Sequence, residues 1–265
     1  MKYLITGAKG FIGRNLVAHL QQDENIELLQ YDIDNTDEQL DAWLAECDGI
    51  FHLAGVNRPK DNAEFEKGNT GFTEKICAKL KESGRKPQII MSSSIQAEKD
   101  NLYGSSKRHA EEALADFANT ANAPVGIFRL KNVFGKWCRP NYNSVVATFC
   151  YNIAHDEPIQ ISDPANDLDL VHVDDVVTAF MTSMGALQAG DETKIDPATR
   201  IITDDIPSYR ISLGDLAGRI QFFRNMQESL HLPDFSERFN QQLYSTFLSY
   251  LPSERWRYDL NIRSD

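Results

Sequence analysis

The sequence predicts an α/β fold, a doubly wound parallel sheet with a smaller C-terminal lobe. Three observations predict it. A short apolar strand at residues 2–6 runs directly into a glycine-rich turn and a helix. Strand-length apolar runs then alternate with amphipathic helices as far as residue 130, and this rhythm is lost beyond it. Such alternation is typical of parallel strands joined by right-handed crossovers, with helices on both faces of the sheet.

The turn after the first strand carries three glycines. Gly7, Gly10 and Gly13 are spaced G-x-x-G-x-x-G, and a helix follows whose apolar residues recur at helical spacing to Leu20. Glycines allow a sharp turn and let a diphosphate approach the amides at the positive end of a helix. The spacing is a stretched form of the G-x-G-x-x-G turn that binds dinucleotides. We therefore expect a dinucleotide site here; the alternative is an ordinary strand–helix turn.

The other elements follow in chain order. We expect further strands over residues 26–31, 49–53, 87–92 and 124–130, and helices over 37–46, 63–81 and 103–120. Thr36 and Gln39 form a capping box for the first of these helices. After residue 130 we expect a loop over 132–143, strands over 158–161 and 168–172, helices over 144–154, 174–184 and 212–227, and an irregular helical region over 235–250.

These elements suggest two domains. Residues 1–157 form the dinucleotide-binding domain, to which 168–184 return, and residues 158–167 and 185–265 form a smaller substrate-binding lobe. Open α/β sheets bind ligands at the carboxyl ends of their strands, where such a lobe would close.

Composition narrows the class of protein. The chain has 265 residues and a net charge of -12, which opposes binding to a nucleic-acid backbone. No apolar run approaches the roughly twenty residues that span a bilayer, and the N-terminus has no signal-peptide pattern. The four cysteines lack metal-ligand spacing and are typical of reduced thiols. We expect a cytoplasmic protein that binds neither nucleic acid nor membrane.

A serine run and a Tyr–Lys pair follow the fourth strand. Ser92 to Ser94 end that strand, and Tyr103 and Lys107 stand four residues apart on one face of the next helix. A nearby ammonium stabilises a phenolate, so we expect the pKa of Tyr103 to fall towards neutrality. With the Ser94 hydroxyl, this pair suits proton exchange with an oxygen whose carbon exchanges a hydride with nicotinamide. The alternatives are a serine turn and a surface Tyr–Lys pair.

Five segments together resemble the extended short-chain dehydrogenase/reductases that act on nucleotide sugars: residues 6–13, 52–55, 92–94, 103–107 and 129–135. The longer strings HLAGVNRP, SSSIQA and NVFGKWCRPNYNSVVATFCYNIA, with the late LYSTFLSYLP, resemble the reductases of capsular-polysaccharide synthesis in the UDP-N-acetyl-L-fucosamine pathway. The resemblance implies a Rossmann-like fold and NADPH-dependent reduction of the C4 ketone of a UDP-2-acetamido-2,6-dideoxy-hexos-4-ulose to a UDP-N-acetyl-6-deoxy-talosamine. It also implies a homodimer through the helices over 63–81 and 103–120.

The resemblance also implies roles for individual residues. Tyr103 is the proton donor, Lys107 holds the nicotinamide ribose and tunes Tyr103, and Ser94 polarises the ketone. The implied cofactor-binding residues are Gly7, Lys9, Gly10, Phe11, Ile12, Gly13, Arg14, Asp32, Leu53, Ala54, Gly55, Ser92, Tyr103, Lys107 and Leu130. The implied substrate-binding residues are Ser94 and Asn132, with Arg58, Lys136, Arg139, Asn143 and Ser144 as looser candidates, because a diphosphate attracts cations and amide donors. Each looser candidate could equally be a solvated loop residue.

Several alternatives stay open. Ile95 and Gln96 stand where related dehydratases have an acid and a base, so elimination of water is disfavoured. An NAD-dependent C4 epimerase and a non-catalytic dinucleotide-binding sensor remain as alternative functions. Asp32 would repel the 2′-phosphate of NADPH, whereas Lys9 and Arg14 could pair with it, so NADH is possible beside the implied NADPH.

Two departures from the resembled reductases affect the expected site. Many relatives carry an Arg where this chain has Leu168, so the diphosphate must be held in another way. We expect His172 and Asp174 nearby to be structural, as a packed strand end and a helix cap. The resembled enzymes continue into a metal-binding cupin domain that epimerises C3 before the reduction. This sequence stops at Asp265, so we expect no metal and no such epimerase activity in this chain.

Overall fold

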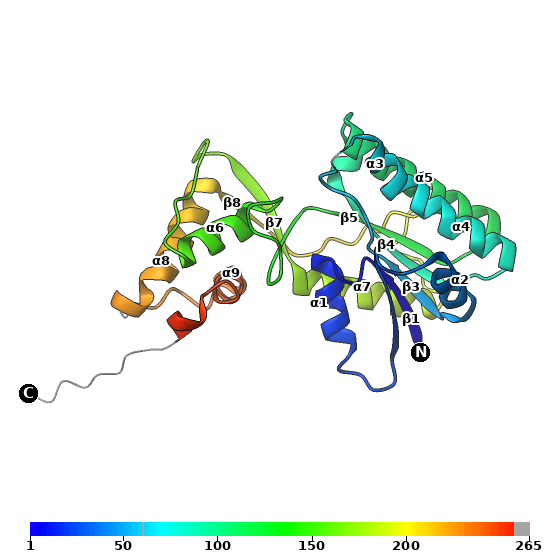
Figure 1. The fold of residues 1–265 in the computed structure, drawn as a ribbon, viewed down its shortest axis with the longest axis horizontal. Helices are drawn as coiled ribbons and strands as arrows, with labels where there is room; N and C mark the ends of the chain where they lie inside the picture. The colour runs from blue at the N-terminus through cyan, green and yellow to red at the C-terminus, as the bar shows by residue number, and fades with distance from the viewer. Residues whose placement is uncertain (60, 230, 257–265) are drawn as a thin grey trace, which may run out of the picture. The chain divides into compact units, whose positions relative to one another are not determined.

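The first part of the protein is built on a five-stranded parallel sheet. The structure is a computed structural model that describes residues 1–59, 61–229 and 231–256. The strand order is β2–β1–β3–β4–β5, and this confirms the predicted fold class. Figure 1 labels β1, β3, β4 and β5 of this sheet. The order reverses direction between β1 and β3, and ligands of open α/β sheets bind beside that point, at the carboxyl ends of the strands. The strands are β1 (Lys2–Thr6), β2 (Glu27–Tyr31), β3 (Gly49–His52), β4 (Gln88–Ser94) and β5 (Val125–Leu130).

Helices cover both faces of this sheet. Side chains of α2 (Asp37–Glu46), α4 (Phe72–Ser83) and α5 (Leu102–Ala121) share one buried core with Leu4, Ile50 and Ile89 of the strands. On the opposite face, Phe180 of α7 (Val173–Gln188) lies 5.1 Å from Phe128 of β5 between ring centroids. The right-handed crossover from β1 to β2 places α1 (Phe11–Leu20) on this second face as well.

Most elements of this part lie within a few residues of their predictions. The capping box is present, since Thr36 Oγ1 accepts from Gln39 N at 3.3 Å and Gln39 Oε1 accepts from Thr36 N at 3.0 Å. The helix predicted over 63–81 is not continuous. It consists of α3 (Ala63–Phe65), a π-helical segment η1 (Glu66–Gly71) and α4, and π-helical turns often mark functional sites.

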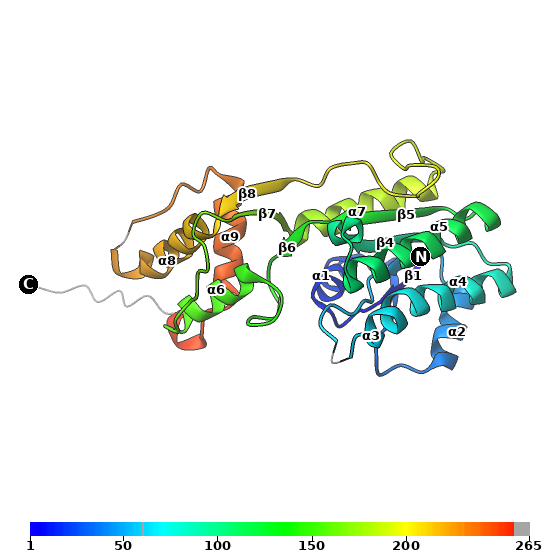
Figure 2. The same ribbon diagram turned by 90° about the horizontal axis from the view of Figure 1, so that it is seen from above.

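The second part of the protein has its own sheet and core. Strands β6 (Asn132–Phe134), β7 (Asp167–His172) and β8 (Ser208–Ser212) pair in the order β6–β7–β8. Residues 132–134 were expected to form a loop, and residues 158–161, expected to form a strand, belong to none of the strands described. Helices α6 (Val145–Ala154), α8 (Leu213–Ser229) and α9 (Arg238–Leu248) enclose the core, and η3 (Ser253–Trp256) follows. Figure 2 labels the helices of both parts, and none described in either is long and apolar enough to cross a membrane.

Three helix starts were predicted in and before this second part. Ser144 Oγ accepts from Ala147 N and Ser212 Oγ from Asp215 N, as expected of helix caps. The helix expected to be capped by Asp174 begins at Val173 instead, so Asp174 lies in its first turn, where its negative charge still favours the helix.

The two compact units differ from the predicted domains in their boundaries. The first unit comprises Met1–Lys131 and Asp174–Ile206, and the second comprises 132–173 and the described residues from 207 on. Residues 132–157 group with the second unit because α6 packs in the same core as α8 and α9. Residues 185–206 group with the first because Ile127 N donates to Arg200 O at 2.9 Å and Ile202 N donates to Ile127 O at 2.8 Å.

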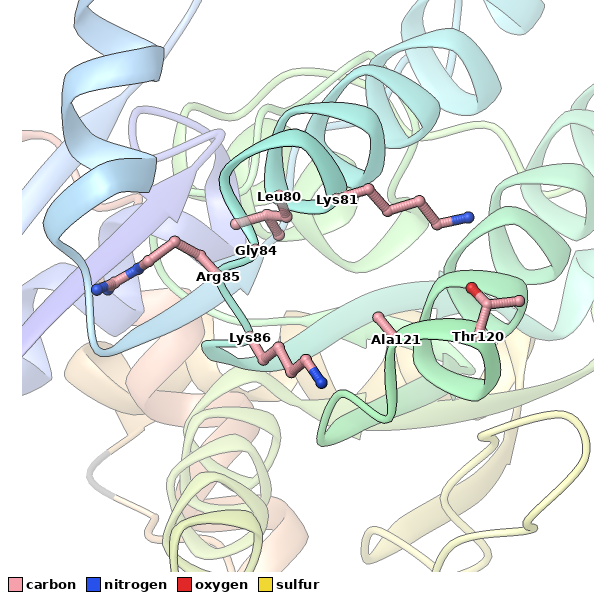
Figure 3. Close-up of a pocket in the computed structure, with 7 residues that line it drawn as sticks. All are labelled: Leu80, Lys81, Gly84, Arg85, Lys86, Thr120 and Ala121. Carbon is pink, nitrogen blue, oxygen red and sulfur yellow. The ribbon is translucent and has the colours of Figure 1, made fainter.

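An open hollow lies at the amino ends of β4 and β5, away from the carboxyl ends where ligands bind. Its volume is about 310 Å³, and Figure 3 shows its lining residues. They come from the ends of α4 and α5: Leu80, Lys81, Gly84, Arg85, Lys86, Thr120 and Ala121. Lys81 is already paired with Asp116 at 3.0 Å. The basic side chains of this hollow lie near the C-terminal ends of two helices, where positive charge stabilises the helix dipole. The hollow therefore reflects helix termination.

Candidate active site

The glycine turn after β1 is so tight that two of its positions accept only glycine. Gly7 has a φ of +70°, and a Cβ there would lie 2.8 Å from Ala54 N. A Cβ on Gly13 would lie 2.1 Å from Gly7 O, and one on Gly10 would lie 3.1 Å from the same oxygen. Helix α1 then begins with no side-chain cap and no acidic residue in its first turn. A cradle of this kind fits the diphosphate of a dinucleotide.

The loop after β3 is held against this turn by a directed chain of hydrogen bonds. Ala54 N donates to Thr6 Oγ1 at 3.3 Å, and Thr6 Oγ1 lies 2.8 Å from His52 Nδ1. On the other side of the ring, His52 Nε2 lies 2.9 Å from Thr73 Oγ1, which donates to Asn69 O. Because the Thr73 proton is used on Asn69, His52 carries its own proton on Nε2. Burial, with a smaller effect of Lys107, lowers the pKa of His52 to about 3. The imidazole in this series of hydrogen bonds is therefore neutral.

The acid at the end of β2 is fixed beside the glycine turn. Asp32 Oδ2 accepts from Lys9 N at 2.7 Å, and Asp32 Oδ1 accepts from Ile33 N at 2.8 Å. The ammonium of Lys9 is paired with Asp34. Lys9 and Arg14 were the two cations expected to hold a 2′-phosphate, and the Lys9 ammonium is thus already paired with the Asp34 carboxylate.

Ser94 and Tyr103 lie together at the carboxyl end of β4. Ser94 Oγ accepts from Gln96 N at 3.2 Å, which leaves its O–H able to donate. The Tyr103 ring lies 5.7 Å from that of Phe65 between centroids. Burial raises the pKa of Tyr103, and a hydrogen bond with Ser94 partly opposes it. The expected fall of this pKa towards neutrality is therefore wrong, and the phenol keeps its proton at neutral pH.

Lys107 is directed at the end of β4. Its side chain is buried, and Nζ donates to Ser92 O at 3.0 Å. A Cβ on Gly55 would lie 3.6 Å from Nζ, so the loop after β3 also approaches it. Burial lowers the pKa of Lys107 to about 8, and Glu111 acts in the opposite direction. The ammonium is charged below about pH 8.

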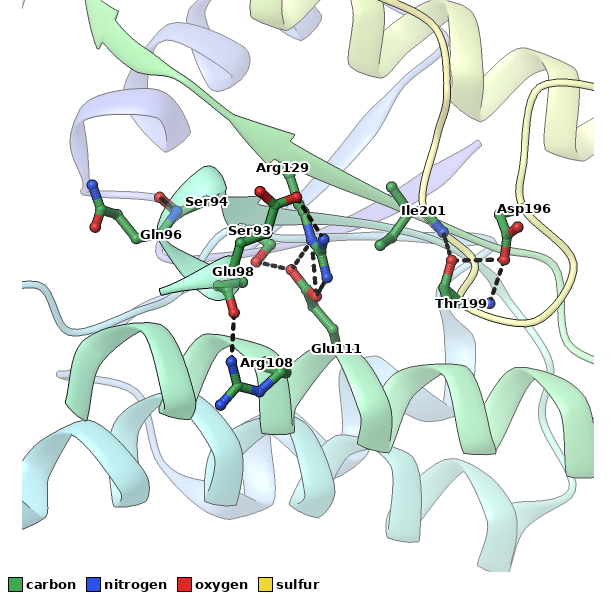
Figure 4. Close-up of polar contacts among 11 residues, drawn as sticks. Ser93, Ser94, Gln96, Glu98, Arg108, Glu111, Arg129, Asp196, Thr199 and Ile201 are labelled. Atoms are coloured by element: carbon green, nitrogen blue, oxygen red, sulfur yellow. Dashed lines mark hydrogen bonds and ion pairs between the residues drawn. The ribbon is translucent and has the colours of Figure 1, made fainter. Parts of the chain in front are cut away.

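One turn further along α5, Glu111 joins the helix to strands β4 and β5. It is 4% exposed and accepts from Ser93 Oγ. The Arg129 guanidinium grips the same carboxylate, with Nη2 at 2.7 Å from Oε2 and Nε at 3.1 Å from both oxygens. Arg129 also pairs with Glu98 at 3.1 Å. Figure 4 shows Ser93, Glu111 and Arg129 pointing toward one another.

The structure brings the expected catalytic and cofactor residues to one edge of the first sheet. The glycine turn contacts Leu53 and Ala54, and Gly55 approaches Lys107. Ser92 and Ser94 are paired in register with Phe128 and Leu130 of β5. Ile95 and Gln96 form the start of the turn η2 (Ile95–Glu98) and supply no acid or base.

Most of the expected substrate residues lie in the second unit, where they make contacts of their own. Asn132 Nδ2 donates to Asp169 O at 3.2 Å, and Ser144 caps α6. Lys136 and Arg139 each lie over an aromatic ring of their own loop, at 5.2 and 4.9 Å from the ring centroids. The exposed candidates are Arg58, in the first unit, and Asn132, Arg139 and Asn143, in the second.

The remaining residues singled out in the sequence lie in β7 and its end. Leu168 stands in β7 opposite Ile211. His172 is 5% exposed and its ring lies edge-on to Phe134, with centroids 5.1 Å apart. These contacts match the packed strand end expected of His172. Among the residues that the structure describes, no group of three or more acidic, His or Cys side chains is placed to hold a metal ion.

Sequence reasoning missed two supporting residues. Glu111 had a detectable signal, because it follows Lys107 at the spacing that separates Lys107 from Tyr103. Asn69 had none. Its Oδ1 accepts from Val56 N at 2.8 Å and its Nδ2 donates to Ser106 Oγ at 2.9 Å, so it joins the loop after β3 to α5 from within the unforeseen π-helical segment.

Comparison with known proteins places this site in a family. The family model described as "NAD dependent epimerase/dehydratase family" matches residues 3–195. The chain is 45% identical over its whole length, and over 69% of the relative's, to a UDP-2-acetamido-2,6-beta-L-arabino-hexul-4-ose reductase of Pseudomonas aeruginosa.

Solved structures agree. The capsular polysaccharide assembling protein CapF of Staphylococcus aureus is 39% identical, with a TM-score of 0.84 over 97% of this chain and 68% of that one. The Bordetella bronchiseptica enzyme WbmF, solved with NAD+ and UDP, has a TM-score of 0.74 over 94% of this chain and 91% of that one. At 18% identity this second likeness shows the fold alone. The chain belongs to the NAD dependent epimerase/dehydratase family and is an NAD(P)-dependent oxidoreductase of the extended short-chain dehydrogenase/reductase type.

Proposed function

We propose that this chain reduces the C4 ketone of a UDP-2-acetamido-2,6-dideoxy-hexos-4-ulose to a UDP-N-acetyl-6-deoxy-talosamine, on the route to UDP-N-acetyl-L-fucosamine for capsule or O-antigen polysaccharide. The observation that carries the proposal is the grouping of Ser94, Tyr103 and Lys107 at the end of β4, beside the glycine cradle. The named activity of the Pseudomonas aeruginosa relative, at 45% identity over the whole chain, supports this choice of substrate.

The residues of the site can perform the proton part of this reduction. A bound nicotinamide dinucleotide supplies the hydride to the carbonyl carbon. The Tyr103 phenol is neutral at physiological pH, as phenols ordinarily are, and burial raises its pKa further. It donates its proton to the carbonyl oxygen as negative charge develops there. The Ser94 hydroxyl accepts from Gln96 N and hydrogen-bonds Tyr103 in this structure, and its O–H can turn to the same carbonyl oxygen when the substrate binds. The charged Lys107 adds a positive potential at this edge.

The epimerase alternative makes an additional demand on Tyr103. A C4 epimerase must remove a proton from a sugar hydroxyl and later return one, so its tyrosine acts as base and as acid, whereas a reductase uses it only as proton donor. Burial raises the pKa of Tyr103, which suits the donor role. The reductase named for the Pseudomonas aeruginosa relative supports reduction, and elimination of water lacks an acid and a base at Ile95 and Gln96.

The contacts at the end of β2 bear on the choice of dinucleotide. Asp32 is held by two backbone amides at the position where an acid binds the adenosine ribose of NAD. Its charge would repel a 2′-phosphate, and Lys9 is paired with Asp34. These contacts favour NADH over the NADPH that the resemblance implies.

The test is nicotinamide oxidation by the purified chain, followed by absorbance, with the UDP-linked keto sugar and either NADH or NADPH. Tyr103→Phe should lower kcat at least about 100-fold, the usual contribution of a general acid, while dinucleotide binding is kept. Tyr3→Phe, a matched variant at the amino end of β1, should keep full activity. A sensor would show no turnover in any variant, and an epimerase would interconvert UDP sugars without net oxidation.

A further inference from the structure

We propose that Glu111 is a positioning residue of this active site, which holds Lys107 in its charged form and fixes helix α5 against the end of β4. The proposal rests on the proposed function, because it concerns the same site. It goes beyond that function by assigning a role to a buried ion pair outside the Ser–Tyr–Lys set.

Lys107 and Glu111 join α5 to the end of β4. Tyr103, Lys107 and Glu111 follow one another at intervals of four residues and so share one face of α5. The last two are anchored to consecutive residues of β4, since Lys107 Nζ donates to Ser92 O and Glu111 accepts from Ser93 Oγ. The catalytic Ser94 is the next residue of this strand. A change at Glu111 therefore moves the helix that carries the proton donor relative to the strand that carries its partner.

Glu111 is itself held by residues of β4 and β5. Glu111 is 4% exposed, and a buried carboxylate keeps its charge only when it is paired and hydrogen-bonded. Arg129 supplies a two-pronged ion pair from β5, and Ser93 supplies a hydrogen bond from β4. Ser93 and Arg129 are register partners in the two strands. The carboxylate is thus paired with a guanidinium and fixed in place by two strands of the sheet.

Groups from β3, β4 and α5 surround Lys107. From β3, His52 is buried and neutral, with a pKa lowered to about 3. From β4 comes the uncharged Ser92 carbonyl. From α5 come Tyr103, whose phenol is neutral, and Glu111. Among the described residues, Glu111 is the group whose charge counteracts the burial of this ammonium.

Charged groups on the remaining packed elements have no described bond to Lys107. Arg129, on β5, is paired with the Glu111 carboxylate, so it affects Lys107 through Glu111. Glu98, on η2, pairs with the outer side of Arg129, and its side chain is 68% exposed. The loop after β3 and η1 contribute Gly55 and the uncharged Asn69. Glu98 is therefore the matched control, since it also pairs with Arg129 but contacts neither β4 nor Lys107 in any bond described.

The experiment compares pH profiles of kcat/KM for the wild-type chain, Glu111→Gln and Glu98→Gln. The wild-type alkaline limb should fall near pH 8, where Lys107 loses its proton. Loss of a neighbouring opposite charge shifts a pKa by about one unit or more. In Glu111→Gln the ratio of kcat/KM at pH 6 to that at pH 8.5 should therefore rise about seven-fold. Glu98→Gln should leave the ratio unchanged, and Glu111→Asp, which keeps the charge, should restore it.

A second readout does not depend on turnover. The Cε resonance of Lys107, in protein labelled with ¹³C-lysine and assigned with Lys107→Arg, should titrate about one pH unit lower in Glu111→Gln. If the keto sugar is not reduced, the proposed function fails while this titration still decides the inference. If Glu111→Gln does not fold, Glu111→Gln with Arg129→Gln removes the pair without leaving a buried charge. An unchanged Lys107 titration, or an equal shift in Glu98→Gln, overturns the inference.

Discussion

The sharpest test of the dinucleotide site is Asp32→Asn. In the structure the carboxylate is held by the amides of Lys9 and Ile33 at 2.7 and 2.8 Å. It therefore cannot swing away from a phosphate placed on the adenosine ribose. We expect the variant to bind NADPH better relative to NADH, because one fixed negative charge is removed and the shape of the side chain is kept.

The size of the effect follows from the position of the charge. Two unit charges about 4 Å apart interact by about 1 kcal/mol in water and about 4 kcal/mol near a protein surface of lower dielectric. Asp32 is half-buried and near the surface, so we take about 1–2 kcal/mol, which is roughly 5- to 30-fold in the ratio of the two dissociation constants. The gain should shrink as salt is added, because exposed charges are screened.

The assay is quenching of protein fluorescence or enhancement of nicotinamide fluorescence, titrated with NADH and NADPH at low and high salt. Asn presents only one oxygen to the two amides, and although water can satisfy the other amide at this partly exposed position, Tm must be measured in parallel. Asp41→Asn is the control, since this acid pairs with Lys79 and has no contact with the glycine turn in any bond described. If the ratio of the NADPH and NADH dissociation constants in Asp32→Asn stays within about two-fold of that in Asp41→Asn, Asp32 does not discriminate between the two dinucleotides.

Three further outcomes test other parts of the molecule. Gly13→Ala places a Cβ 2.1 Å from Gly7 O and should abolish dinucleotide binding, whereas Gly218→Ala in α8, with nothing within 4 Å, should not. His52 stays neutral in the fold to about pH 3 but protonates near 6.5 when unfolded. The free energy of unfolding should thus fall by up to about 1.4 kcal/mol per unit as pH drops through that window, and His52→Gln should flatten the slope in acid denaturation curves while His231→Gln should not. Sedimentation should give a dimer through α4 and α5, as the resemblance implies, and a monomer-sized value would contradict it.

Local signals predicted those parts of the fold that depend on neighbouring residues. The strand–turn–helix at the N-terminus and the caps at Thr36, Ser144 and Ser212 all depend on contacts within a few positions, and the structure has each of them. The errors concern partners that are far away in the chain. Residues 132–134 form a strand only because β7 offers them a parallel edge. The run at 158–161 looked equally extended, but Asn152 Nδ2 binds Pro158 O at 3.0 Å and joins this segment to α6.

The same division applies to the candidate site. Spacing alone predicted that Tyr103 and Lys107 lie on one face of a helix, because a helix repeats every 3.6 residues. It also predicted Ser94 at a strand end, because a strand ends where its apolar run ends. It could not predict Asn69, whose contacts require a π-helical segment that no residue pattern indicated. It also could not show that Lys9 is engaged by Asp34, since that ion pair joins two loops from different crossovers.

The protonation state of Tyr103 was predicted wrongly from residue spacing. A nearby ammonium lowers the pKa of a phenol, whereas burial raises it, and here burial has the larger effect. A Tyr–Lys pair four residues apart suggests a lowered phenol pKa, but that requires the ammonium to be near the phenol and the phenol to be solvated. Here the ammonium donates to the Ser92 carbonyl, and burial raises the pKa of Tyr103 while lowering that of Lys107 to about 8. Both groups therefore hold a proton below pH 8. An edge with two protonated groups is suited to giving a proton to a ketone, and the upper pH limit of this step depends on how well Glu111 keeps Lys107 charged.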